Sequence, residues 1–443
     1  MNLMSMLILI ALLIVIISVL NENVFHLQSD IALVLFSSLI SVAVLLLGQI
    51  PAFSAVRDFT KTVGDFGFEE YLLDSVLCFM LFAGAGKVNM GKFRQNIKSI
   101  SLLALLTTVI SSGFYGLLFW GISALFGLNM DIWMCILLGC VVSPTDPIAA
   151  TGILNKLGLS KNVTSVIESE SLFNDGTGVA LFVFVKSIVA RSGESNFIVV
   201  MLTEILGALV VALVVSFLLF RLIKLTKNPI MHIMISILDV SLCYAICEHF
   251  GFSGVIASVI CGMYFAAQFH KIERKRVVAD PENIYGIFWE SAESILNAVL
   301  FVMIGLSLLS AEISSSILIL VPAGIIIVII SRFVGVGISG LCIGRTIPGG
   351  YNLPEFVTLM TWSALKGGLS LALAMGTKAF LPEDIYLIFM NIAYITIFFT
   401  VIVQGLTTKG VYLKIEKHKA ARLHKSSTAA TERFGKTEGG ETK

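Results

Sequence analysis

Two short polar stretches inside long apolar runs contain the residues best suited to chemistry. The first is SPTDP at 143–147, and the second is ESESLFND at 168–175. An ionisable side chain at the centre of a bilayer costs roughly 2.5 kcal/mol or more, so acids in such segments usually serve a function. Carboxylates, hydroxyls and backbone carbonyls supply oxygen ligands, which hard cations prefer. The two stretches therefore predict a cation site within a membrane, as expected of a transporter.

The composition is that of a polytopic membrane protein with an all-α fold. Hydrophobic residues make up 57% of the chain and charged residues 13%, with a mean hydropathy of +0.94. These values lie far from those of soluble globular domains. Because a span needs roughly 20 mostly apolar residues, we expect about thirteen transmembrane helices, the first being retained and not cleaved. They cover residues 3–20, 31–50, 71–86, 99–127, 131–153, 163–190, 197–223, 229–249, 252–269, 289–311, 315–343, 354–377 and 383–408.

The basic residues predict the orientation of the chain. Loops that follow odd-numbered spans contain fourteen Lys and Arg residues, whereas loops that follow even-numbered spans contain four. By the positive-inside rule the odd loops face the cytoplasm, which places the N-terminus outside and the C-terminus inside. The polar tail at 409–443 is expected to be cytoplasmic and largely disordered. Basic clusters next to spans suit lipid headgroups in the bilayer, so no nucleic-acid partner is expected, and no cofactor is indicated.

Two spans at matching positions are interrupted by Pro or Gly. Span 131–153 contains Pro144 and Pro147 on either side of Thr145 and Asp146, and span 354–377 contains KGG at 366–368. Such interruptions mark the binding site in transporters built from inverted repeats. Proline removes a backbone donor, and carbonyls freed at membrane depth are tolerated only where they line protein or a cavity. A plain proline kink is the alternative, but the acid between the prolines favours a functional break.

The offset of seven spans between these interruptions predicts the domain organisation. Residues 1–408 would form one membrane domain, in which inverted repeats at 3–190 and 229–408 flank a linking helix at 197–223. An odd offset inverts the second repeat relative to the first. The two broken helices would then cross in opposite senses.

Span 163–190 provides further candidate ligands. On a helix, Ser171 and Asp175 lie one turn apart on one face, and Glu170 and Asn174 do so on a neighbouring face. Glu168, nearer the start of the span, is expected at the interface. A buried acid is far less costly as an ion pair, so Glu170 requires a basic partner. Arg332 and Lys366 both lie within spans and are both candidates.

The cysteines give weaker signals. All seven lie in apolar spans without the spacing of a zinc knuckle or a disulfide framework, which favours packing. Cys243 and Cys247 stand one helical turn apart and would suit a ligand pair, but no second thiol pair lies nearby in the sequence. Asp239, midway along its span, could line a cavity or meet a polar neighbour.

Together these motifs resemble the monovalent cation:proton antiporter superfamily, in the branch of NhaP-type antiporters and sodium/proton exchangers. The resemblance spans most of the membrane region. It rests on TDP at 145–147, ESLFND at 170–175, FSG at 252–254, NAVLFVMIG at 297–305, SR at 331–332 and KGGLS at 366–370. It implies a six-helix core that holds spans 5, 6, 12 and 13, and a second domain that forms a homodimer.

The resemblance also implies roles for individual residues. Asp175 would be the essential carboxylate that binds the cation and the proton. Thr145, Ser171 and Asp146 would complete the cation site, directly or through water, and Asn174 would hold the crossing helices together. Glu170 would form a structural ion pair with Arg332 or Lys366. The family usually has arginine at position 366, and lysine lacks its bidentate fork, which weakens the case for a Glu170 pair with Lys366.

We therefore expect a secondary antiporter, not an enzyme, that exchanges Na⁺ for H⁺ across the plasma membrane, with Li⁺ or K⁺ as alternative substrates. Asn174 stands where the electrogenic branch resembles an Asp-Asp pair, so one titrating carboxylate predicts electroneutral exchange. A cation channel would use the same ligands, but inverted broken helices favour alternating access. An intramembrane aspartyl protease would resemble a Gly-x-Gly-Asp motif, which FNDG at 173–176 does not reproduce.

Overall fold

The computed structural model describes residues 3–48, 76–88, 90–146, 148–190, 197–273, 284–310 and 317–438, and these are mostly helical. The first half contains α1 Leu3–Leu20, η1 Asn21–Phe25, α2 Ser29–Gly48, α5 Leu77–Gly86, α6 Met90–Ser101, η4 Leu102–Thr107, α7 Thr108–Leu125, α8 Ile132–Val142, α9 Ile148–Lys156, α10 Lys161–Val189 and α11 Phe197–Ile223. The second half contains α12 Pro229–Phe250, α13 Gly254–Glu273, α14 Ile284–Ser307, η5 Leu308–Ser310, α15 Ile317–Ile343, η6 Gly344–Thr346, η7 Pro348–Gly350, α16 Leu353–Trp362, α17 Gly368–Met375, α18 Glu383–Phe398, η8 Phe399–Gln404 and α19 Gly405–Glu438.

These helices confirm the all-α membrane fold. Among the described residues, nine helical runs are long and apolar enough to cross a membrane, and three shorter apolar helices accompany them: Leu77–Gly86, Ile132–Val142 and Gly254–Phe269. Every predicted span overlaps one or more helices. Residues 49–50, 71–75, 147, 311 and 315–316 of the predicted spans lie outside the described residues. The total of thirteen crossings stays a prediction.

Polar residues at the helix starts explain several boundaries. Asp131 accepts a hydrogen bond from the backbone N–H of Met134 at 2.8 Å and so caps α8. Asn228 caps α12 in the same way, with Pro229 at the first helical position, where a missing N–H costs nothing. The same helix ends at Gly251, whose φ of 71° suits glycine at a helix C-terminus.

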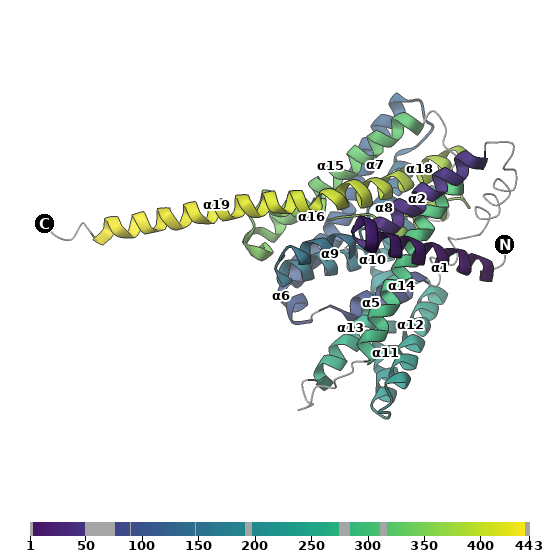
Figure 1. Cartoon of the computed structure of the whole chain (residues 1–443), viewed down its shortest axis with the longest axis horizontal. Helices are drawn as coiled ribbons and strands as arrows, with labels where there is room; N and C mark the ends of the chain where they lie inside the picture. The colour runs from purple at the N-terminus through teal and green to yellow at the C-terminus, as the bar shows by residue number, and fades with distance from the viewer. Residues whose placement is uncertain are drawn as a thin grey trace.

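The helices form two groups with the interrupted helices between them (Figure 1). One group packs α5, α11, α12, α13 and α14 around a cluster that includes Phe82, Phe265 and Trp289. The long helix α10 contacts α8 and α9 as well as α13. This position brings α10 next to both the first break and the group of helices that contains α13.

The two interrupted helices meet at their breaks. Residues 143–146 separate α8 from α9, and residues 363–367 separate α16 from α17. The backbone N–H of Asp146 donates to the carbonyl of Leu365 at 2.8 Å, and the two residues form an isolated antiparallel bridge. Each break therefore satisfies a backbone group of the other, as required in a region without water. The pairing confirms the predicted crossing, whereas the exact repeat boundaries stay a prediction.

The C-terminal tail contains the last helix of the described chain. Helix α19 continues to Glu438 and extends away from the other helices (Figure 1), while residues 439–443 lie outside the described part. Alanine, lysine and glutamate are strong helix formers, and tertiary contacts hold the first part of this helix. Arg422 pairs with Glu355 at 2.9 Å, and the hydroxyl of Tyr351 donates to Glu416 at 2.5 Å. Burial and the contact with Glu416 raise the pKa of Tyr351 above its usual value, so its hydroxyl stays a donor.

Candidate cation site

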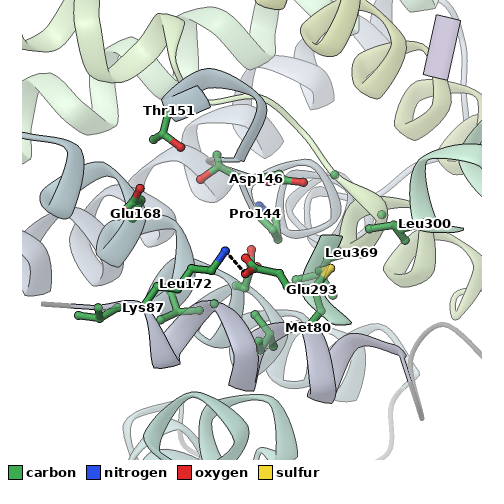
Figure 2. Close-up of a pocket in the computed structure, with 17 residues that line it drawn as sticks. Met80, Lys87, Pro144, Asp146, Thr151, Glu168, Leu172, Glu293, Leu300 and Leu369 are labelled. Atoms are coloured by element: carbon green, nitrogen blue, oxygen red, sulfur yellow. Dashed lines mark ion pairs between the residues drawn. The ribbon is translucent and has the colours of Figure 1, made fainter. Parts of the chain in front are cut away.

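A cavity of about 170 Å³ lies at the crossing of the broken helices (Figure 2). Its described lining includes four acids: Asp146 from the first break, Glu168 and Asp175 from α10, and Glu293 from α14. Glu293 forms an ion pair of 2.5 Å with Lys87, which follows α5. The cavity is therefore rich in carboxylate oxygen, the ligand type that suits a hard cation.

Hydroxyl and amide groups join the first break to α10 beside this cavity. The hydroxyl oxygens of Thr145 and Ser171 lie 3.0 Å apart, and the amide of Asn174 donates to Thr145 at 3.1 Å. On its other side, Asn174 accepts a hydrogen bond of 2.6 Å from Thr108 on α7. Asn174 thus links three elements through one side chain, which fits the expectation that it holds the crossing helices.

Arg332, and not Lys366, contacts Glu170. Nη2 of Arg332 lies 2.9 Å from Oε1 of Glu170, and the two residues are only 4% and 1% exposed. Asn174 supplies a further, longer contact of 3.5 Å to the same oxygen. The pair joins α10 to α15 across the buried core. Among the described residues, no ion pair of Lys366 is found.

Lys366 instead serves the first break. Its terminal nitrogen donates to the carbonyl of Ser143 at 2.9 Å. Ser143 is the C-cap residue, directly after α8. A hydrogen-bond donor at a helix C-terminus satisfies a carbonyl that lacks a helical partner. A single carbonyl requires one donor and no bidentate fork, which explains how lysine fits where the family usually has arginine.

Some residues of this site were not predicted from the sequence. Glu168 was expected at the interface but lines the cavity together with Asp175. Glu293 and Lys87 are not among the predicted site residues, although an acid in the apolar span 289–311 is a usable signal. Thr108 had no such signal, because hydroxyl residues are common in its span. Asp239 is not part of the described cavity lining and meets a polar neighbour, the hydroxyl of Ser216, at 2.8 Å.

Gly367 permits the close approach of the two breaks and gives a direct test of the site. A Cβ atom at this position would lie 3.0 Å from Cβ and 3.1 Å from Oδ2 of Asp146. Since alanine adopts the extended backbone found here, Gly367→Ala should act by displacing Asp146. We expect proteoliposome exchange to slow by about tenfold, as small misplacements of functional groups do.

The matched control for this variant is Gly121→Ala on α7. No atom lies within 4 Å of the Cβ that alanine would place there, so its exchange rate should equal that of the unaltered protein. Equal rates for the two variants would show that the position of Asp146 is unimportant.

Crossed broken helices with an acid-lined cavity at the crossing define a cation/proton antiporter of the inverted-repeat class. Residues 40–414 match the family described as "Sodium/hydrogen exchanger, transmembrane". The chain therefore belongs to the sodium/hydrogen exchanger family, which confirms the resemblance noted in its motifs.

Individual relatives agree with this family. The chain is 31% identical over 349 residues to the Na⁺/H⁺ antiporter NhaP of Pseudomonas aeruginosa, covering 77% of this chain and 80% of that protein. It is 29% identical over 325 residues to the Na⁺/H⁺ antiporter NhaH of Halobacillus dabanensis, covering 72% and 76%. The solved sodium proton antiporter MjNhaP1 of Methanocaldococcus jannaschii matches with a TM-score of 0.71 over 94% of this chain and 99% of that one. At 20% identity, this last match shows the shared fold.

Proposed function

We propose that this protein exchanges one monovalent cation for one proton at Asp175, with Na⁺ as the cation and Li⁺ or K⁺ as alternatives. The observation that carries the proposal is the meeting of Asp146 and Asp175 in one cavity at the helix crossing. The Thr145 and Ser171 hydroxyls lie beside each other next to it. These groups supply the oxygen ligands that such a cation requires.

Competition for a single carboxylate is sufficient for coupling. Asp175 holds either the cation or the proton, and each neutralises its charge. Moving the bare carboxylate across the membrane is costly, so only the occupied site changes sides. In this mechanism Asp146, Thr145 and Ser171 bind the cation with Asp175. Asn174 and the pair of Glu170 and Arg332 keep the surrounding helices in place.

Reconstituted protein tests the exchange directly. Purified protein in proteoliposomes containing a pH-sensitive dye should move protons when Na⁺ is added outside, and parallel additions of Li⁺ and K⁺ rank the substrates. Proton movement that is independent of all three cations would contradict antiport. Single-vesicle currents at channel rates would instead indicate a channel.

The setting of this exchange is the cell membrane. The distribution of Lys and Arg supports an outside N-terminus and a cytoplasmic C-terminus. The family resemblance supports a homodimer formed by the domain outside the six-helix core. A C-terminal reporter that is active only in the cytoplasm tests the orientation, and cross-linking in native membranes tests the dimer.

Exchange should be electroneutral. Asn174 precedes Asp175, Glu170 is held by Arg332, and Asp146 acts as a supporting ligand, so Asp175 alone changes its proton occupancy. One proton then replaces one monovalent cation, and the membrane potential adds nothing. An electrogenic carrier would gain about 2.3 kcal/mol per charge per 100 mV.

A voltage clamp measures this directly. Proteoliposomes are held at different potentials with potassium and valinomycin, after showing that potassium is not a substrate. The reversal point of exchange should not move with voltage. A shift equal to one charge per cycle would disprove Asp175 as the sole titrating group, and Lys366 would be the next group to test.

A further inference from the structure

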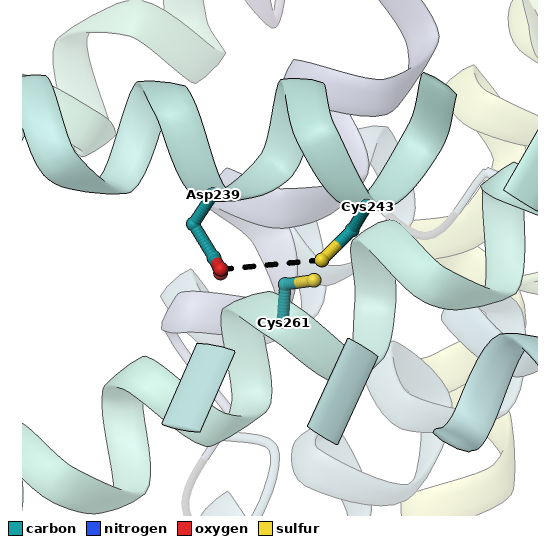
Figure 3. A group of neighbouring side chains, drawn as sticks. All are labelled: Asp239, Cys243 and Cys261. Carbon is teal, nitrogen blue, oxygen red and sulfur yellow. Dashed lines mark hydrogen bonds between the residues drawn. The ribbon is translucent and has the colours of Figure 1, made fainter. Parts of the chain in front are cut away.

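A second group of possible ligands lies outside the transport site, within the helices α11 to α13. Asp239 and Cys243 are one turn apart on α12, and Cys261 projects toward them from α13 (Figure 3). The ligand atoms of the three side chains all lie within 4.8 Å of one another. Each of the three residues is 0% exposed. The structure therefore groups Cys243 with Cys261 and Asp239, and not with Cys247 as the helical spacing suggested.

Asp239 accepts hydrogen bonds from two neighbouring side chains. Its Oδ2 accepts from the hydroxyl of Ser216 on α11 at 2.8 Å, and its Oδ1 accepts from the thiol of Cys243 at 3.9 Å. A carboxylate offers about four acceptor positions. No ion pair of Asp239 is found within the described part of the chain. A buried acid of this kind in a membrane protein is expected to have a function.

The donor set distinguishes this cluster from the transport site. Two sulfur atoms and one carboxylate suit a thiophilic metal ion, whereas the transport cavity offers oxygen ligands for a hard cation. Zn²⁺ is typically held by four ligands drawn from cysteine, histidine and carboxylate groups. The hydroxyl of Ser216 donates to Asp239 at 2.8 Å, so its oxygen is adjacent to the cluster and is a candidate for a fourth, neutral ligand.

We propose that Asp239, Cys243 and Cys261 bind one thiophilic divalent cation of the Zn²⁺ class, with Ser216 completing the site. Binding converts both thiols to thiolates and releases two protons to solvent. One divalent cation replaces two protons, so the charge of the site is the same before and after binding. No redox partner is involved, and the buried region gains no net charge.

A cavity lies in the same group of helices as the cluster. This cavity of about 300 Å³ is lined by Tyr285, Trp289 and the polar residues Lys87 and Glu290. The indole N–H of Trp289 donates to the hydroxyl of Ser236 at 3.0 Å, and Ser236 lies one turn before Asp239 on α12. Trp289 therefore contacts both this cavity and the turn of α12 that precedes Asp239.

Cadmium is the preferred probe, because it favours thiolates and gives an ultraviolet charge-transfer band when bound to them. The purified full-length protein is kept reduced with a phosphine and titrated with Cd²⁺, and bound metal is counted by elemental analysis after dialysis. We expect one Cd²⁺ per chain together with the thiolate band. Loss of an outer partner of a metal ligand typically weakens binding 10- to 100-fold. Cys243→Ser, Cys261→Ser and Asp239→Asn should therefore weaken it by at least about 100-fold.

Two variants serve as matched controls. Cys247→Ser removes a buried thiol one turn further along α12, and Asp175→Asn alters the transport site. Both should bind one Cd²⁺ with the affinity of the unaltered protein. The elution profile of each variant in size-exclusion chromatography without metal shows whether it is folded.

The outcomes separate the proposal from its competitors. Absence of a tightly bound Cd²⁺, or binding that survives in the folded Cys261→Ser variant, would overturn it. Loss of binding in Asp175→Asn would assign the metal to the transport cavity and would overturn it equally. Because Asp239 and its partners are not part of the transport mechanism, failure here leaves the proposed exchange unaffected.

Discussion

Asp175→Asn is expected to abolish cation-driven proton movement while leaving a folded protein. The amide has nearly the same size as the carboxylate, but it has neither the charge that binds a cation nor a group that exchanges a proton at neutral pH. Proteoliposome exchange should fall to the level of empty vesicles. The elution profile and thermal midpoint should stay close to those of the unaltered protein.

Ser171→Ala provides the graded control for this result. It removes one neutral ligand beside Thr145 and keeps the titrating group. We expect the apparent affinity for the cation to weaken more than the maximum rate falls. Sodium-driven proton movement retained by purified Asp175→Asn protein would remove the central claim of the mechanism.

Glu170→Ala is expected to cause the largest loss of stability among the site variants. Nε and Nη1 of Arg332 have no hydrogen-bond partner among the described residues, so Glu170 is the main compensation for this buried guanidinium. Breaking a buried ion pair by removing one partner costs roughly 3 to 5 kcal/mol. The thermal midpoint in detergent should fall far more for Glu170→Ala than for Ser171→Ala.

A double variant separates the ion pair from packing. Glu170→Met combined with Arg332→Met removes both charges and retains much of the side-chain volume. It should therefore melt above either single Met variant, because no charge is left unpaired. Similar midpoints for Glu170→Ala and Ser171→Ala would mean that Glu170 has no structural role as an ion-pair partner.

The sequence was most informative where a residue type is costly in a membrane. The prolines at 144 and 147 and the KGG at 366–368 predicted the two breaks, and the acids inside apolar spans made Asp146 and Asp175 candidates for the site, because few alternatives justify such residues there. The roles assigned to these residues by family resemblance stay predictions. Their meeting in one cavity is an observation of the structure.

Partner choice was beyond the reach of the sequence. Helical spacing identifies neighbours within one helix, such as Cys243 and Cys247, but contacts between helices depend on how each helix is rotated in the bundle. The sequence therefore indicated that Glu170 needs a basic partner, but it did not identify Arg332 as that partner. For the same reason the sequence did not indicate that Cys261 lies beside Asp239.

The expectation of a largely disordered tail came from composition alone and stays a prediction. Its Lys, Thr and Glu content is typical of disordered segments. Such content is also compatible with a helix when part of the segment is held by tertiary contacts. The ion pair between Arg422 and Glu355 is such a contact. A short polar tail that can contact a helix start is thus poorly judged from composition alone.

The carboxylate of Glu355 contacts both the start of α16 and the tail helix α19. Glu355 accepts a hydrogen bond of 3.0 Å from the backbone N–H of Asn352, which caps α16, and also pairs with Arg422 of the tail. Helix α16 is a stiff rod of about 15 Å, given 1.5 Å per residue, and the break containing Lys366 lies at its opposite end. A displacement of the tail would therefore be transmitted through Glu355 and along α16 to the break at residues 363–367.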